Sequence, residues 1–495
     1  MSLSKVLLTH STELTMRQSS SWCVCVRLFA AALFCVTSAA VDASSQPPDH
    51  VSIHESTVIW STVRYATSPE NGFVPGSLDK KIITDHHFKG YVLENRYLKV
   101  TLVPGFGGRI LSMIYKPTGH EQLYHTEVGV PFGIKQDVFY YNWMMVYGGI
   151  FPTFPDAEHG KTWLRPWTFR LVKETGSDVT VSMSMKDDFV YSAAPSRFRI
   201  GATHIEATTY VTLKADRAAL DVGIVLKNSR DQTINYEYWT CTTLAPGSAP
   251  EHPKTTGGAE IIAPIETYST PEWWRSLSDA DVRVGPNKSR FEKLRYFKNW
   301  PTMGIAYAAP DMGGANFWGV INHDNEEGII RIADNRVTPG LKMWTWGFPS
   351  FTKEADPRRE PSEQQPYIEL WAGVSNEFFH SARLPARGEV SIRETYSPTV
   401  GMSHVTQANE NILVNLHAEG SRVNLQFFCI EPAKRLRVTL KRGDTVLFSD
   451  NVEADAKSGN SVSAAIPAGD SGNLIKLTIA TTEGKELIAS ETRIK

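Results

Sequence analysis

The chain has 495 residues, of which 41% are hydrophobic and 21% charged, and its formal net charge is -2. This composition is typical of a globular protein long enough for one large domain and a smaller one. Because the net charge is near zero, electrostatic attraction to nucleic acid or to an anionic membrane is not expected. The 13 Trp and 17 Tyr residues are more informative. Aromatic rings stack on the C–H faces of sugars, although a Trp-rich core also accounts for many of them.

Residues 1–43 have the three parts of a secretory signal peptide. Arg17 and Arg27 precede the apolar run 28–36, and small residues follow that run. A basic part, an apolar part and a small-residue cleavage site in this order are typical of export signals. We predict a signal peptide whose true start is Met16, and an exported protein that is periplasmic or extracellular.

Neither a membrane span nor a disulfide framework is expected. The apolar run of the signal is far shorter than the roughly 20 residues that a membrane-spanning helix needs. Three of the five cysteines would leave with the signal peptide, and the other two, Cys241 and Cys429, fall in different predicted domains. An exported protein with this distribution does not depend on a network of disulfides.

Residues 44–400 are predicted to form one large, nearly all-β domain. Apolar residues alternate with the two-residue period of a strand, as they do from Val179 to Met185. No window has a helical apolar period over more than about two turns, which is short for a globular helix. Residues 266–300 are instead a loop-rich excursion with short helical pieces. Strands are predicted at 56–65, 93–103, 110–115, 304–308, 317–322, 328–333, 366–373 and 389–396.

The pattern changes in residues 408–495, which are predicted to form a separate module. Apolar residues again alternate, for example at Ile412, Val414 and Leu416, and about six or seven short strands in this length indicate a small immunoglobulin-like β-sandwich. The module has few aromatic residues and no cluster of histidines or acids. We interpret it as an accessory domain.

The segment 147–167 is the most unusual part of the large domain. Its repeated glycines and prolines prevent a helix, and its aromatic residues are too apolar to leave in water. A long irregular segment that combines aromatic with charged residues is what the lining of a polar-ligand pocket requires. The alternative is a rigid loop packed over the core. Its charged residues and histidine include Asp156, Glu158, His159, Lys161 and Arg165.

Few residue spacings in the chain indicate a catalytic, phosphate-binding or metal-binding motif. No Cys-x-x-Cys pair occurs to complete a zinc site, no glycine-rich loop lies between a strand and a helix, and no Gly-x-Ser-x-Gly elbow is present. We therefore predict no metal and no cofactor. The remaining candidates are Glu158 and His159, together with Glu369, which lies between Ile368 and Leu370. If those two face the core, Glu369 faces the other side of the sheet, towards solvent or a concave cleft.

Three elements near the start of the large domain occur in an order known from one superfamily. They are Leu93-Glu-Asn-Arg-Tyr-Leu98, Pro104-Gly-Phe-Gly-Gly-Arg-Ile110 and Lys116-Pro-Thr-Gly-His-Glu121. This arrangement resembles the opening of aldose 1-epimerase (galactose mutarotase) superfamily proteins. Further on, His159-Gly160 with the Pro-Trp that follows is similar to the element that supplies their first substrate-binding histidine, and Tyr367-Ile-Glu-Leu-Trp371 is similar to the strand that supplies their catalytic glutamate.

The chain more closely resembles a mutarotase-like domain family of unassigned function. Members of that family often carry a Tyr-Trp pair, a Trp-x-Trp-Gly element and a closing Glu-x-Tyr-x-Pro element, which here are Tyr238–Trp239, Trp344–Gly347 and Glu394–Pro398. The resemblance covers roughly residues 50–400. It implies a large β-supersandwich of the galactose mutarotase-like kind, followed by the small immunoglobulin-like sandwich.

The resemblance also implies catalytic roles. Glu369 would be the general base that takes the proton from the anomeric hydroxyl, and His159 would bind the sugar or protonate it on the ring side. The superfamily's second histidine has no counterpart, because the corresponding segment 235–241 holds no histidine. Tyr238 or Glu237 could substitute for it, or simple mutarotation could be lost.

Further residues are expected to bind the substrate. The superfamily's Asn-Arg pair is not found in its usual setting, and Arg109 or Arg165 could serve instead. Trp344 and Trp346 share a face if their segment is a strand, either as a sugar platform or as part of the core. The predicted substrate-binding residues are Arg109, Glu158, Arg165, Trp167, Trp239 and Trp346.

Three functions remain open at this point. The first is a sugar epimerase or mutarotase acting on a free or polymer-derived saccharide. The second is a non-catalytic carbohydrate-binding protein. The third is a lyase on uronic-acid polymers, with Tyr238 or His159 as the base and Arg109 or Arg165 neutralising the uronate. The sequence does not predict the oligomeric state.

Overall fold

The computed structural model describes residues 50–64, 66–68, 72–73, 77, 79–126, 128–129, 148–163, 165–190, 201–308, 312, 314–348, 366–432, 435–468 and 474–493. The predicted signal peptide lies outside the described residues. Residues Asp49–Lys495 group as one compact unit. Within the described part of the chain, no helix is long and apolar enough to cross a membrane.

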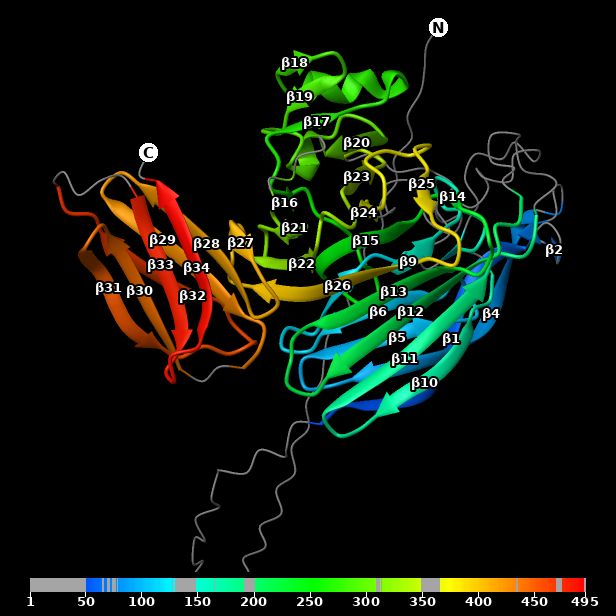
Figure 1. Cartoon of the computed structure of the whole chain (residues 1–495), viewed down its shortest axis with the longest axis horizontal. Coiled ribbons are helices and arrows are strands. Elements are labelled where there is room, and N and C mark those ends of the chain that lie inside the picture. The colour runs from blue at the N-terminus through cyan, green and yellow to red at the C-terminus, as the bar shows by residue number, and fades with distance from the viewer. Residues whose placement is uncertain are drawn as a thin grey trace, which may run out of the picture. The chain divides into compact units, whose positions relative to one another are not determined.

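The large domain is a sandwich of two sheets, in which most neighbouring strands are antiparallel (Figure 1). The first sheet has 14 strands, of which 13 follow one path and β9 (Ile150–Thr153) pairs with β15 and β6. The path is β18 (Arg283–Gly285), β19 (Lys288–Arg290), β17 (Thr267–Ser269), β20 (Gly304–Ala308), β23 (Gly340–Thr345), β24 (Ile368–Gly373), β15 (Trp239–Ser248), β7 (His120–Leu123), β6 (Arg109–Tyr115), β5 (Leu98–Val103), β4 (Asp79–Glu94), β1 (Ser52–Arg64) and β8 (Val128–Gly129).

The second sheet has eight strands and closes the core. Alternating burial along β12 and β13 matches the two-residue apolar period of their sequences. Residues such as Val100 and Met113 of the first sheet and Val181 and Ile224 of the second belong to one buried cluster, so the predicted large sandwich is confirmed. The strand order is β10 (Thr168–Glu174), β11 (Asp178–Lys186), β12 (Ile205–Lys214), β13 (Leu220–Asn228), β26 (Glu389–Val400), β22 (Glu327–Ala333), β21 (Phe317–Asn322) and β16 (Ala259–Ile262).

The predicted excursion at residues 266–300 contains two short 3-10 helices, η3 (Glu272–Ala280) and η4 (Phe297–Asn299), beside the short strands β17 to β19. Two further pairs of short strands complete the large domain. They are β14 (Ile234–Tyr236) with β25 (Ala382–Leu384), and β2 (Thr67–Ser68) with β3 (Gly72–Phe73).

The C-terminal residues form a second, smaller β-sandwich with its own buried cluster, as the sequence predicts. Tyr115 of the large domain donates a hydrogen bond to the carbonyl oxygen of Ala456 at 2.6 Å, which ties the two sandwiches together. One sheet holds β27 (Gln407–Ala408), β28 (Ile412–Glu419), β29 (Arg422–Cys429) and β32 (Asn460–Ala465), and the other holds β31 (Thr445–Val452), β30 (Leu436–Arg442), β33 (Leu474–Thr481) and β34 (Glu486–Arg493).

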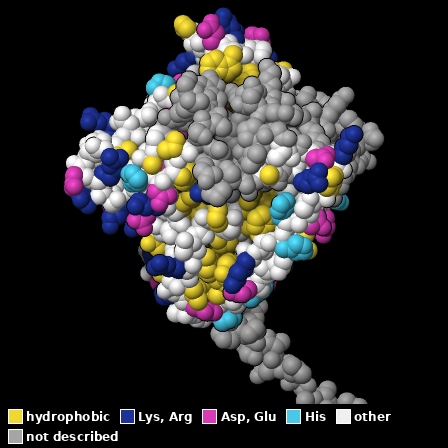
Figure 2. Space-filling view, turned by 90° about the vertical axis from the view of Figure 1, so that its right-hand side faces the viewer, with side chains coloured by type: hydrophobic (Ala, Val, Ile, Leu, Met, Phe, Trp, Pro, Cys, Tyr) yellow, Lys and Arg dark blue, Asp and Glu magenta, His cyan; other side chains and the backbone are white. Residues whose placement is uncertain are grey.

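Hydrophobic side chains gather on the side of the molecule seen in Figure 2. Strand β10 ends the path of the eight-stranded sheet, and six of its seven residues are exposed. The exposed large apolar residues of β1, β4 and β10 are Ile59, Ile82, Leu171 and Val172.

The central strands β20, β23 and β24 of the 14-stranded sheet are buried on both faces, and this positions the candidate site. In β24, Ile368 and Leu370 point into the sandwich core, whereas Trp371 points to the opposite face and packs in a second buried cluster. Glu369 lies on that opposite face, as its alternation with Ile368 and Leu370 predicts. We call this second cluster the outer aromatic cluster; its aromatic members are Trp60, Phe106, Tyr124, Phe151, Trp163, Trp239, Tyr307, Trp344, Trp346, Tyr367, Trp371 and Phe378.

Candidate functional site

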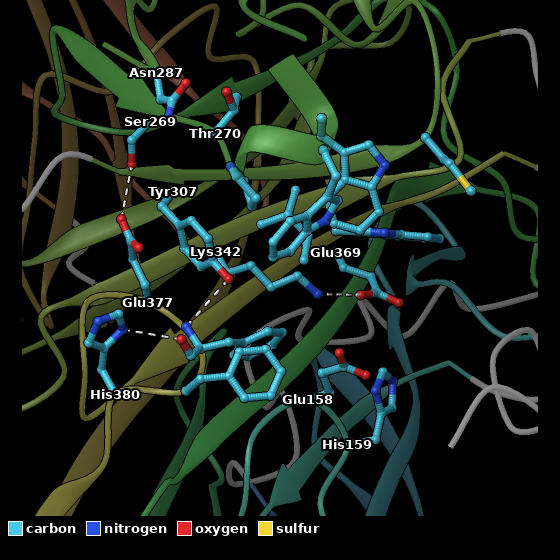
Figure 3. A pocket seen from close by; sticks show the side chains of 18 of the residues that line it. Glu158, His159, Ser269, Thr270, Asn287, Tyr307, Lys342, Glu369, Glu377 and His380 are labelled. Carbon is cyan, nitrogen blue, oxygen red and sulfur yellow. Dashed lines mark hydrogen bonds and ion pairs between the residues drawn. The ribbon is translucent and has the colours of Figure 1, made fainter. Parts of the chain in front are cut away.

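A pocket of about 870 Å³ opens in the outer aromatic cluster. The register of the sheet places Glu369 of β24 between Thr243 of β15 and Trp344 of β23, and all three residues line the pocket. Lys342 lies two residues before Trp344 on the same face of β23, so its side chain reaches the pocket too (Figure 3). The pocket therefore rests on the centre of a rigid sheet.

Glu369 is a buried carboxylate surrounded by hydrogen-bond donors. Its oxygens accept hydrogen bonds from the Lys342 ammonium at 3.2 Å, the Trp371 indole nitrogen at 2.7 Å and the Tyr367 hydroxyl at 3.4 Å. Burial keeps the pKa of Tyr367 well above its usual value, so this hydroxyl remains a donor. A buried charge requires such partners, because leaving it unpaired costs several kcal/mol.

Lys342 is buried beside aromatic rings. Its ammonium lies 3.8 Å from the centre of the Trp371 ring and 5.2 Å from that of Phe378, which are distances at which a cation interacts with the face of a ring. Burial lowers the pKa of Lys342, and the negative charge of Glu369 opposes this shift. The lysine is therefore a better proton donor than a lysine in water.

His159 approaches Glu369 from the irregular segment. One ring nitrogen of His159 and one carboxylate oxygen of Glu369 lie within 4.8 Å of each other. Burial, followed by the charges of Lys342 and Arg109, holds the pKa of His159 well below its ordinary value, so the imidazole is neutral at pH 7. Gly160 is required next to it, because a Cβ there would lie 2.4 Å from the carbonyl oxygen of Phe154.

The irregular segment is held in place by a buried ion pair. The Lys161 ammonium lies 2.8 Å from an Asp187 carboxylate oxygen, and both side chains are almost fully buried. Lys161 also donates hydrogen bonds to the carbonyl oxygens of Phe189 and Gly201, at 3.0 and 3.3 Å. The segment thus contributes Phe151, Glu158 and His159 to the pocket, while Lys161 anchors it.

Three donor atoms of the site are of the kinds that bind metals. Ligand atoms of His159, Cys241 and Glu369 all lie within 4.8 Å of one another, and zinc accepts this combination of nitrogen, sulfur and oxygen. However, Lys342 pairs directly with Glu369, and its positive charge and that of Arg109 act on both His159 and Cys241. The positive charges of Lys342 and Arg109 would repel a divalent metal ion. The residues present therefore fit acid–base chemistry better than metal binding.

The structure brings four of the nine predicted site residues together. Glu158, His159, Trp346 and Glu369 all line the pocket. The Trp346 indole donates to the Tyr367 hydroxyl at 3.2 Å, and that hydroxyl in turn donates to Glu369.

Three predicted aromatic residues lie in the packed interior and do not line the pocket. Tyr238 faces the sandwich core, where its hydroxyl lies 3.2 Å from that of Thr240. Trp239 packs so tightly that a Cβ on Gly373 would lie 2.3 Å from its ring. Trp167 packs edge-on against Phe154. Their positions follow from alternation and packing, and none reaches the cavity.

The two predicted arginines do not line the pocket. Arg109 is fully buried, donates to the carbonyl oxygen of Gly148 at 2.6 Å and lies 3.9 Å from the ring centre of Phe151. Arg165 stacks on Phe189 at 4.0 Å. Among the described residues, Lys342 is a cation that lines the cavity. Sequence reasoning missed it, although it alternates with Trp344 and Trp346 in one segment.

Fold and site together define an all-β supersandwich that is similar to galactose mutarotase-like proteins, with a buried carboxylate in an aromatic pocket. Residues 79–389, more than half of the chain, match the family described as domain of unknown function DUF5107, and the chain belongs to that family. Residues 407–489 match a second family, described as YphG-like protein, second domain.

Several solved structures are similar to parts of this chain. A TPR-domain containing protein from Parabacteroides distasonis ATCC 8503 is 18% identical, with a TM-score of 0.54 over 71% of this chain and 55% of that one; the match thus spans little more than half of that protein. A galactose mutarotase-like protein from Clostridium acetobutylicum is 11% identical, with a TM-score of 0.42 over 63% and 96% of the two chains. A galactose mutarotase related enzyme from Lactobacillus acidophilus is 14% identical, with a TM-score of 0.39 over 64% and 99%.

Glu237 is a buried carboxyl group outside the pocket lining, and we expect it to make the stability of the fold depend on pH. Its carboxylate accepts hydrogen bonds from the Trp239 indole at 3.3 Å and from the backbone N–H of Phe379. Burial raises the pKa of Glu237 from 4.5 to about 7. A carboxyl group whose pKa is raised on folding stabilises the protein fully below the unfolded pKa, and this contribution is lost as the pH rises through the folded pKa.

Replacing Glu237 by glutamine should remove this pH dependence. Glutamine keeps the acceptor oxygen but carries no charge to bury. The free energy of unfolding of Glu237→Gln, relative to the wild type, should rise by up to about 3 kcal/mol between pH 4.5 and pH 8.5. Urea unfolding at the two pH values measures this, and an unchanged difference between the proteins would refute the raised pKa.

Proposed function

We propose that the pocket binds a carbohydrate and that Glu369 and Lys342 together catalyse the interconversion of its anomers. The observation that carries this proposal is the buried Glu369–Lys342 pair on the floor of an aromatic pocket. Aromatic residues suit the C–H faces of a sugar, and a few fixed polar groups suit its hydroxyls. The proposal extends the similarity to mutarotase-like proteins from fold to chemistry.

The spacing of the pair suits the reaction. In an aldose, the anomeric hydroxyl and the ring oxygen are attached to the same carbon, so they lie side by side. Glu369 takes the proton of the anomeric hydroxyl while Lys342 donates a proton to the ring oxygen. The bond from C1 to the ring oxygen breaks and C1 becomes an aldehyde carbon. Concerted transfer avoids an unstabilised charge on either oxygen.

The open-chain sugar then turns about the C1–C2 bond and closes with the opposite configuration at C1. For closure, Lys342 accepts the proton of the attacking hydroxyl and Glu369 returns its proton to the new anomeric oxygen. The neutral imidazole of His159, beside Glu369, is suited to hydrogen-bonding a sugar hydroxyl rather than to acting as a cationic acid. Lys342 thus takes the role of the superfamily's second histidine, which has no counterpart in the segment 235–241.

One observation favours non-catalytic binding as the second candidate. Glu369 already accepts hydrogen bonds from three donors of the protein, and these donors compete with a sugar hydroxyl for its oxygens. A uronate lyase has less support, because Arg109 and Arg165 lie outside the pocket lining. Export to the periplasm or the extracellular space, from the N-terminal signal pattern, would expose the protein to polymer-derived saccharides.

The wild-type protein is expected to accelerate anomer exchange of at least one free aldose. Galactose, glucose, xylose, arabinose and mannose form a suitable panel, and saturation-transfer NMR between the two anomeric protons measures the rate. A thermal-shift assay with the same sugars measures binding. Binding without faster exchange would favour the non-catalytic function, and the lack of both would contradict a sugar site.

A further inference from the structure

The pocket contains a second group of polar side chains that the proposed chemistry does not use. We call Ser269, Asn287, Glu377 and His380 the outer polar group; all four line the pocket and none is buried. Figure 3 shows this group on one side of the cavity and Glu158, His159 and the Glu369 carboxylate on the other. The pocket thus has a buried polar end and a more exposed one.

The outer polar group is ordered by contacts within the protein. The Ser269 hydroxyl donates to Glu377 at 3.3 Å, across two segments that are far apart in the sequence. Nδ1 of His380 lies 3.1 Å from the carbonyl oxygen of Phe378 and donates to it. The Nε2 atom of a neutral His380 is then an acceptor, which suits a hydroxyl group.

Two exposed aromatic rings lie in the same pocket lining. Trp273 of η3 is 70% exposed, and Phe379 of the loop after β24 is 45% exposed. Phe379 has a φ of 66°, a left-handed conformation that is costly for a bulky residue and is kept where the surroundings or function require it. Exposing a large apolar ring to water is unfavourable, and a ligand that stacks on the ring removes that surface from water.

We propose that Trp273, Phe379 and the outer polar group form a second sugar subsite, and that the substrate is an oligosaccharide with a free reducing end. The reducing-end sugar lies at Glu369 and Lys342, and the next unit lies against the exposed rings. This inference rests on the proposed function and adds the class of substrate. The volume of about 870 Å³ lies near the upper end of the roughly 300–1,000 Å³ found for ligand pockets, and exceeds what one sugar ring needs.

Calorimetric titration with matched series of sugars tests the subsite. The probes are galactose, glucose and xylose, each beside its β-1,4-linked disaccharide and trisaccharide. For at least one series, the oligosaccharides should bind about 10-fold more tightly than the monosaccharide. Trp273→Ala should weaken oligosaccharide binding about 5- to 10-fold and change monosaccharide binding less than about 2-fold.

Two further variants separate the subsite from general damage. Phe379→Asn removes the ring but keeps a residue that tolerates the left-handed conformation, and it should act like Trp273→Ala. Tyr210→Ala removes an exposed ring of β12 that is not in the pocket lining, and it should change nothing. Equal affinities within every series, or equal weakening of both ligand classes, would overturn the subsite and leave the proposed function intact. A lack of binding by all probes would overturn both.

Discussion

Replacing Glu369 by glutamine is expected to lower the rate constant for anomer exchange by about 10²- to 10⁴-fold, the usual contribution of a positioned acid or base. Glutamine fills the same space, and its single amide oxygen can still accept the hydrogen bond from the Trp371 indole, but it cannot take the proton of the anomeric hydroxyl. The sugar should still bind through the aromatic lining of the pocket, while the loss of the counter-charge of Lys342 lowers the stability of the folded protein. Saturation-transfer NMR gives the rate, and calorimetry gives the affinity.

A matched variant distinguishes lost chemistry from lost folding. Glu121 of β7 is a buried carboxylate of the same sheet that accepts backbone N–H groups of Met113, Gln122 and Leu123 and does not line the pocket. Glu121→Gln should reduce stability but keep the rate per folded molecule. If Glu369→Gln retains more than a tenth of the wild-type rate while folded, Glu369 is not the base.

Replacing Glu394 by glutamine is expected to lower the free energy of unfolding of the large domain by about 3–5 kcal/mol. Arg331 and Glu394 are a fully buried pair between β22 and β26, in which the guanidinium donates to one carboxylate oxygen at 2.7 and 2.8 Å. Glutamine leaves the charge of Arg331 in the core without a counter-charge. Urea unfolding monitored by tryptophan fluorescence measures the loss.

Two comparisons make this prediction specific. The exposed pair of Asp231 and Arg387 is solvated, so Asp231→Asn should not shift the unfolding midpoint measurably. A double replacement, Arg331→Met with Glu394→Leu, removes both charges and should recover part of the lost stability. If Glu394→Gln is as stable as Asp231→Asn, the buried pair does not stabilise the fold in the way described.

The sequence predicted the fold better than the site. Strict alternation along strands such as β12 and β13 follows directly from the geometry of a sheet with one face in a core, and it is visible in a single sequence. The same rule predicted that Glu369 points away from Ile368 and Leu370. The glycines and prolines of the irregular segment likewise predicted that His159 lies in a loop rather than a helix.

The rule failed where both faces of a sheet are buried. Alternation separates two faces but does not tell which one lines a cavity. Tyr238 and Trp239 were both assigned to the site from the family resemblance, and they point into different packed clusters. Arg109 was assigned to the substrate as a replacement for the superfamily's Asn-Arg pair, whereas it stacks on Phe151. Lys342 was missed because a lone lysine in a strand is ordinarily on the surface.

The order of residues by itself determined that this chain is nearly all β, that it forms a large and a small sandwich, and that Glu369 and Leu370 face opposite ways. These properties depend on local periodicity, which each strand carries in its own sequence. Only the tertiary structure decided that Glu369 pairs with Lys342, that His159 reaches them, and that Trp273 and Phe379 line the same pocket. Those contacts join segments far apart in the sequence, and they form only when sheet register and side-chain packing bring the segments together.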